Sequence, residues 1–140
     1  MANISTPIAP ADGYATSARS AFNGLQVLAE TQRLTANDLA RNCTLLAALA
    51  VECALKHFLA TTGTPNNNLR GHNLVDLWER ANVAGLAIEA KAPYWCEKLS
   101  DVTTGPLFFI RYGYGATGAL VIPPPLLVQE ITNLLTTIGI

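Results

Sequence analysis

The sequence predicts an all-α protein, an antiparallel bundle of about five helices around one central apolar helix, with a glycine-rich loop before the last helix. Residues 45–55 are apolar at every position except Glu52, and a helix that is apolar all round is buried among other elements. Elsewhere, apolar residues recur three or four positions apart, as on one face of a helix. The 140 residues suit a single domain over 1–140, with residues 1–11 as a flexible arm.

The central helix is predicted from Thr35 to Gly63. Thr35 and Asp38 have the spacing of a capping box, and Gly63 followed by Pro65 is typical of a helix C-terminus. Because this helix is expected to be wrapped on all sides, its large apolar side chains are expected to be buried. Among them are Leu46, Leu49, Cys53, Leu55 and Leu59.

The first helix is predicted from Asp12, whose side chain can cap it, to about Gln32. Its apolar residues follow one helical face, namely Tyr14, Ala18, Ala21, Phe22, Leu25, Leu28 and Ala29. After the central helix, residues 64–71 contain proline, glycine and three asparagines and therefore predict a loop.

A third helix is expected over about Asn73 to Ala84, because Asn73 and Asp76 again have capping-box spacing. A short fourth helix is expected to start at Pro93 and to end before Gly105 and Pro106.

The segment 107–122 differs from the rest of the chain because aromatic and β-branched residues flank three glycines. This composition is compatible with a hairpin or with an ordered loop, and we favour a loop because an isolated two-stranded ribbon is marginally stable. After three prolines at 123–125, Leu127, Ile131, Leu134 and Ile138 recur at helical spacing. They predict a final helix that closes the bundle.

The composition is rich in apolar residues and poor in charge. Half of the residues are hydrophobic, 14% are charged and the formal net charge is −1. The nine basic residues form no run, so the chain lacks the basic surface of a dedicated DNA-binding protein. With so few charges, some apolar surface is expected to meet a second copy of the chain, through the first or the last helix. We therefore expect a homodimer.

The three cysteines, Cys43, Cys53 and Cys96, are expected to be reduced and buried. Their spacing does not match a zinc site, and the two histidines do not complete one, so neither a metal nor a cofactor is expected. The N-terminus lacks a secretory signal pattern, and no uninterrupted apolar run reaches the roughly 18 residues that span a bilayer. These features favour a cytoplasmic protein without a membrane segment.

Two charged residues stand out on the central helix. Glu52 and Lys56 are four residues apart, in the favourable order for an ion pair. On so apolar a helix the pair is expected to be partly buried, either as a polar clamp between helices or as part of a ligand pocket. His57 points away from this pair, and we assign it no role.

His72 precedes the third helix. It could help to bind an anion at the start of that helix, or it could fill the N-cap region and bond a neighbouring helix. Arg111 and Tyr112 follow an apolar run and could bind a phosphate, or they could hold their loop against Glu52. The nearby glycines lack the Gly-Lys-Ser/Thr pattern of a phosphate loop. We expect Glu52, Lys56, His72, Arg111 and Tyr112 to converge on one polar pocket.

The order VECALKHFL, GHNLVDLWERA and FIRYGYG, followed by an amphipathic helix, resembles the HEPN domains, which are small helical bundles of nucleotide-binding and defence proteins. The resemblance covers roughly Asp12 to Ile138. It rests on Glu52 and Lys56 in the long helix, the Gly-His-Asn-Leu sequence at 71–74, and the Arg-Tyr pair at 111–112. It implies the predicted bundle and a homodimer.

Ribonuclease members of that family carry an Arg followed, four to six residues later, by His. This sequence departs from the pattern, because its only close pair is Arg70 and His72, and Arg41 is far from His57. The resemblance therefore implies a non-catalytic binding or regulatory module for a nucleotide or a partner protein. The alternative is a metal-independent ribonuclease of the toxin or defence type, in which two protomers bring Arg111 of one copy near His72 of the other.

Overall fold

The computed structural model describes residues 10–31, 37–104 and 122–140. Within them the chain forms helices and no strand, which confirms the all-α class. The helices are α1 (Pro10–Ala29), α2 (Asn37–Thr61), a short 3-10 helix (Asn66–Leu69), α3 (Leu74–Val83), α4 (Tyr94–Thr104) and α6 (Pro124–Ile138).

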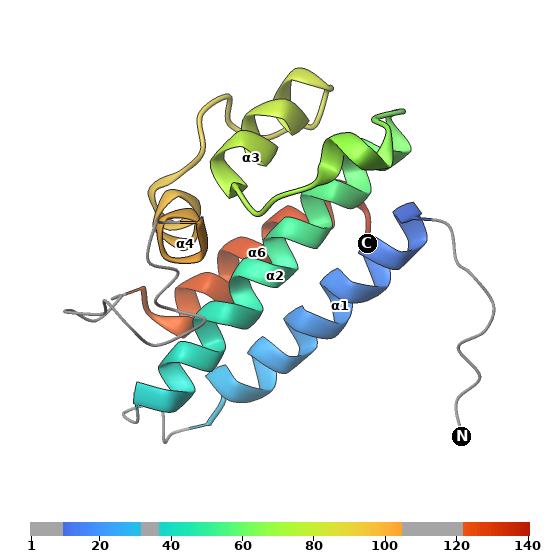
Figure 1. Ribbon diagram of the computed structural model, residues 1–140. Helices are drawn as coiled ribbons and strands as arrows, with labels where there is room; N and C mark the ends of the chain where they lie inside the picture. Colours follow the sequence, from blue (N-terminus) through green and yellow to red (C-terminus); the bar gives the residue numbers. More distant parts are fainter. Residues whose placement is uncertain (1–9, 32–36, 105–121) are drawn as a thin grey trace, which may run out of the picture.

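The helix α2 lies at the centre of the bundle and contacts α1, α3, α4 and α6 (Figure 1). In that view α1 runs antiparallel to α2 on one side, α3 and α4 lie on the other side, and α6 packs behind. The most extensive contact is between α1 and α2. The prediction of a central helix is confirmed.

The C-terminus of α2 follows the predicted glycine signal. Gly63 has a φ of 97°, a conformation that glycine adopts without steric cost. The N–H of Thr64 bonds the carbonyl of Leu59 at 3.0 Å, and the N–H of Gly63 bonds that of Ala60 at 3.2 Å. This pair of bonds is a Schellman motif, which satisfies the last carbonyl groups of the helix. Thr35, the predicted N-cap, lies outside the described residues.

Two other helix starts can be compared with the sequence. The α1 helix begins at Pro10, so Asp12 lies inside its first turn and is not the N-cap; proline is tolerated there because the first N–H groups of a helix have no internal partner. The predicted cap of α3 is confirmed, because Asn73 Oδ1 accepts the N–H of Asp76 at 3.0 Å. The final helix begins at Pro124, as expected from the prolines before it.

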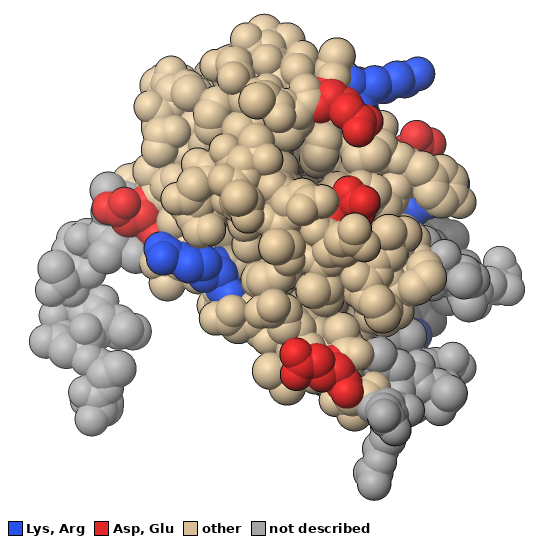
Figure 2. All heavy atoms as spheres, turned by 180° about the vertical axis from the view of Figure 1, so that it is seen from behind, with Lys and Arg blue, Asp and Glu red and all other residues tan. Residues whose placement is uncertain are grey.

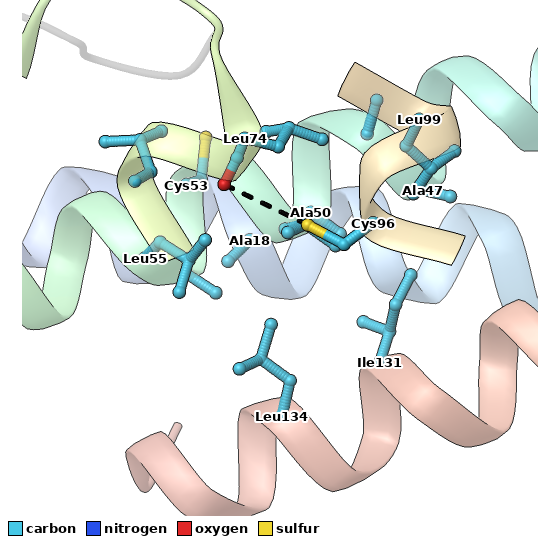
Figure 3. Packing of buried hydrophobic residues seen from close by; sticks show 14 of the residues in the cluster. Ala18, Ala47, Ala50, Cys53, Leu55, Leu74, Cys96, Leu99, Ile131 and Leu134 are labelled. Atoms are coloured by element: carbon cyan, nitrogen blue, oxygen red, sulfur yellow. Dashed lines mark hydrogen bonds between the residues drawn. The ribbon is translucent and has the colours of Figure 1, made fainter. Parts of the chain in front are cut away.

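The core combines small residues of α1 and α2 with larger side chains of the other helices (Figure 3). Ala18, Ala47 and Ala50 are fully buried, and small residues let helix backbones approach closely. Larger side chains from the other helices fill the remaining space around α2, among them Leu74, Leu99, Ile131 and Leu134.

All three cysteines are free and buried, as predicted. Figure 3 shows Cys96 between α2 and α6, with its Sγ donating to the carbonyl of Leu74 at 3.9 Å. Burial raises the pKa of Cys96 to about 12. Burial also raises the pKa of Cys53 to about 11, with a further contribution from the neighbouring Glu52 charge. The thiols therefore behave as small apolar groups.

The prediction that α2 is wrapped on all sides is wrong at Leu49, and Leu46 is also less buried than predicted. Cys53, Leu55 and Leu59 are buried, but Leu46 is only partly buried and Leu49 is 43% exposed. At 100° per residue, Leu49 shares a stripe of α2 with Leu45, Glu52 and Lys56, which we call the Glu52 stripe. No described helix crosses the side of α2 that faces the viewer in Figure 1. An apolar side chain therefore does not by itself imply that another element covers it.

The stretch Arg41–Thr61 is long and apolar enough to cross a membrane by length and mean composition, although Glu52 and Lys56 interrupt it. However, 67% of its most apolar window is buried inside the bundle. This burial is what the core helix of a soluble protein shows.

Candidate functional site

Glu52 and Lys56 form the ion pair that their spacing predicts. Lys56 Nζ lies 2.9 Å from Glu52 Oε2. Both residues are buried, with 9% and 6% of their surface exposed. Because a buried charge without a partner is strongly destabilising, each group supplies the partner that the burial of the other requires.

His72 reaches the same carboxylate from the segment before α3. Its Nδ1 lies 2.8 Å from Glu52 Oε1. A carboxylate accepts hydrogen bonds, so His72 Nδ1 is the donor. Both oxygens of Glu52 are thus occupied, one by Lys56 and one by His72. The side chain of His72 remains 44% exposed, so that its Nε2 is the part of this trio that is available to a ligand. We refer to Glu52, Lys56 and His72 as the Glu52 cluster.

Tyr14 and Asn66 border the cluster, and sequence reasoning did not find them. The hydroxyl of Tyr14 donates to Asn66 Oδ1 at 2.7 Å, and Lys56 Nζ lies 6.0 Å from the centre of the Tyr14 ring. That distance is at the outer limit of a cation–π contact. Tyr14 was identified only as an apolar position of the first helix, and no local spacing links it to a residue 52 positions away.

Backbone N–H groups at the N-terminus of α3 already have hydrogen-bond partners. Asn73 accepts the N–H of Asp76, and the N–H of Leu74 donates to Ser100 Oγ at 3.1 Å. Asp76 also brings a carboxylate into the first turn, where it interacts favourably with the helix dipole. These contacts occupy two of the N–H groups on which an anion site at this helix start would depend. His72 instead fills the region before the helix and bonds α2, which was the other reading of this residue.

The structure therefore brings together Glu52, Lys56 and His72 of the five predicted site residues. Arg111 and Tyr112 lie outside the described residues. His57, to which no role was assigned, is partly buried and its Nδ1 bonds the carbonyl of Ala11 at 2.6 Å. Within residues 10–31, 37–104 and 122–140, no group of three or more His, Cys, Asp or Glu side chains has the arrangement of a metal site.

The segment that leads to His72 is polar and contains no carboxylate. Residues 66–72 read Asn-Asn-Asn-Leu-Arg-Gly-His, and all except Leu69 are exposed. The charges of Glu52 and Lys56 cancel inside the cluster. Exposed Arg70 thus gives this edge of the bundle a positive group with several hydrogen-bond donors, and the protonated form of His72 adds the Nε2–H; such groups recognise a phosphate or a carboxylate.

A comparison of the chain with protein-family models, with curated proteins and with solved structures finds no match.

Proposed function

We propose that the chain is a non-catalytic binding module with an HEPN-like bundle, and that it takes a nucleotide through the surface formed by His72 and Arg70. The observation that carries this proposal is the occupation of both Glu52 oxygens. A carboxylate that is buried and fully bonded positions the imidazole and leaves Nε2 directed away from it. In its protonated form, such an oriented imidazole donates a hydrogen bond from Nε2 to a phosphate.

The state of Lys56 argues for binding and against catalysis. A cation placed at the charge that develops in the transition state can promote the cleavage of a phosphodiester. Lys56 is the cation of the cluster, but it is buried and already paired with Glu52. It therefore positions the site and is not available to contact a phosphate.

The test is a thermal melt of the purified protein with and without ATP or AMP. A ligand that binds only the native state raises the melting temperature by mass action. We expect the wild type to be stabilised and His72→Ala to lose this response. The matched control is His57→Gln, which changes the other histidine and should retain it. Absence of any nucleotide response in the wild type would refute the proposal.

One observation favours the alternative, a metal-independent ribonuclease. An imidazole oriented by a carboxylate is the usual arrangement of a general acid or base. The same preparations are therefore incubated with labelled RNA in the presence of a metal chelator. Cleavage by wild type and by His57→Gln, but not by His72→Ala, would replace the binding module with the enzyme.

The protein is further proposed to be a cytoplasmic homodimer. The three free thiols suit a reducing compartment. Four exposed, uncharged residues recur at helical spacing on α1, namely Thr16, Ser20, Asn23 and Val27, with the charged Asp12 and Arg19 beside them. Val27 is 66% exposed. Light scattering should give twice the 14.9 kDa mass of the chain. Val27→Glu should shift it to the monomer, while Val83→Glu, at an 86% exposed position of α3, should not.

A further inference from the structure

A second site lies on the other side of the bundle from the Glu52 stripe, between α3, α4 and α6. A cavity of about 300 Å³ opens there, which is at the lower end of the volumes that hold small ligands. Trp78 of α3 and Trp95 of α4 form one wall, with ring centres 5.8 Å apart and planes at 86°. Glu130, Asn133, Leu134 and Thr137 of α6 line the opposite side. Their spacing places them on a single helical face.

The third wall is the connection between α3 and α4, and α3 holds it in place. The indole N–H of Trp78 donates to the carbonyl of Glu89 at 2.8 Å. One turn further, Asn82 Nδ2 donates to the carbonyl of Ile88 at 2.9 Å. These bonds fix the backbone of the connection beside the cavity. The cavity is thus preformed.

The charges around this cavity are of one sign. Glu89 and Glu130 line it, and its described lining contains no lysine or arginine. Neither carboxylate takes part in the ion pairs found among the described residues. Figure 2 shows that the face behind α2 is mostly uncharged, with separate acidic groups and few basic ones. The cavity therefore combines two acidic residues, which have no ion-pair partner in the described part of the chain, with an aromatic, apolar wall.

We infer that this cavity binds a small organic cation, an ammonium group attached to an apolar or aromatic body. The ammonium pairs with the carboxylate of Glu130, and the apolar body lies against the small part of Trp78 and Trp95 that lines the cavity, since both residues are largely buried. An anion would meet two carboxylates. A neutral ligand would gain only the apolar contact.

The chain carries its own reporter for this site. It contains two tryptophans, and both line the cavity, so intrinsic indole fluorescence reports binding there. The probe is phenethylamine, whose phenyl ring does not absorb at the red edge of the indole band. Phenethyl alcohol and phenylacetate are the neutral and anionic controls with the same ring. We expect phenethylamine to cause a saturable change in fluorescence. The alcohol should bind about fivefold more weakly, which is the size of effect expected for losing a partly exposed ion pair. The anion should not bind.

Glu130→Gln is the matched variant. It should weaken the binding of phenethylamine about fivefold and leave that of the alcohol unchanged. The control is Glu97→Gln, which removes the same charge from an exposed position of α4 that does not line the cavity. Three outcomes would overturn the inference: no saturable change with the amine, equal affinity for amine and alcohol, or equal effects of the two substitutions.

Discussion

The two sides of α2 differ in what covers them, although both are built largely from apolar residues. On one side, Ala47, Ala54 and Leu55 are completely buried against the surrounding helices. On the other side, the Glu52 stripe begins with partly buried Leu45 and exposed Leu49 and continues into the buried Glu52 and Lys56. The apolar residues of the stripe are therefore more exposed to solvent than its charged residues. Burial along α2 therefore follows the neighbouring elements and not hydrophobicity.

The two sides of α2 should differ most in how much stability is lost when a charged residue is introduced. Leu55→Asp places a carboxylate at a fully buried position without a partner, where the cost is several kcal/mol, comparable with the whole stability of a small domain. We expect this variant not to fold. Circular dichroism would show the loss of helix, and a cooperative melt close to that of the wild type would contradict the buried position of Leu55.

Thiol reactivity tests the covered side without changing the sequence. Cys43, Cys53 and Cys96 are buried with raised pKa values, about 11 for Cys53 and about 12 for Cys96. At pH 8 the native protein should therefore react with a thiol reagent orders of magnitude more slowly than the unfolded chain, in which all three thiols react. Rapid reaction of the folded protein would show that this side opens readily.

The same pKa shifts predict how stability depends on pH. A thiol whose pKa is raised by folding favours the native state while it is protonated. Its contribution is complete below the ordinary pKa of about 9 and is lost as the pH rises toward the native value. Urea melts at increasing pH should therefore show falling stability between about pH 9 and the native pKa of about 12 for Cys96.

A smaller effect is expected at the charged half of the Glu52 stripe. Glu52→Gln keeps the shape of the side chain but weakens two hydrogen bonds to charged or polar partners. We expect a loss of about 1 to 3 kcal/mol in the free energy of unfolding. Glu79→Gln, at an exposed position of α3, should change it by no more than about 0.5 kcal/mol. Equal effects of the two variants would mean that the Glu52 cluster does not stabilise the fold.

The smallest effect is expected at Leu49. Because this side chain is 43% exposed, Leu49→Asp leaves the new carboxylate in contact with water. The cost is the lower helix propensity of aspartate and some lost apolar contact, about 1 kcal/mol in all. A melting temperature within a few degrees of the wild type is expected. If Leu49→Asp unfolds the protein, the Leu49 side chain is buried in solution.

The sequence was sufficient for the helices because their signals are local. The capping residue Asn73 and the C-terminal Gly63 act within one turn of the chain. The ion pair of Glu52 and Lys56 is local in the same sense. The meeting of His72 with Glu52 also followed from sequence, since a loop that returns the chain brings the start of α3 back to α2.

The remaining features depend on contacts that no local pattern encodes. The exposure of Leu49 is set by where α1, α3 and α4 lie, and apolar spacing does not specify which faces they cover. The bond between Tyr14 and Asn66 joins residues 52 positions apart. The cavity between Trp78, Trp95 and α6 takes each wall from a different element, and its tryptophans look like ordinary core residues in the sequence.

The hydrogen bonds of the two histidines have a spectroscopic consequence. His57 Nδ1 faces a carbonyl and His72 Nδ1 faces a carboxylate, and neither partner can donate. Both neutral rings therefore carry their proton on Nδ1. In ¹⁵N NMR the two neutral imidazoles should therefore share this tautomer. His57, which is bonded to α1, and His72, at the candidate site, therefore differ in solvent exposure but not in tautomer.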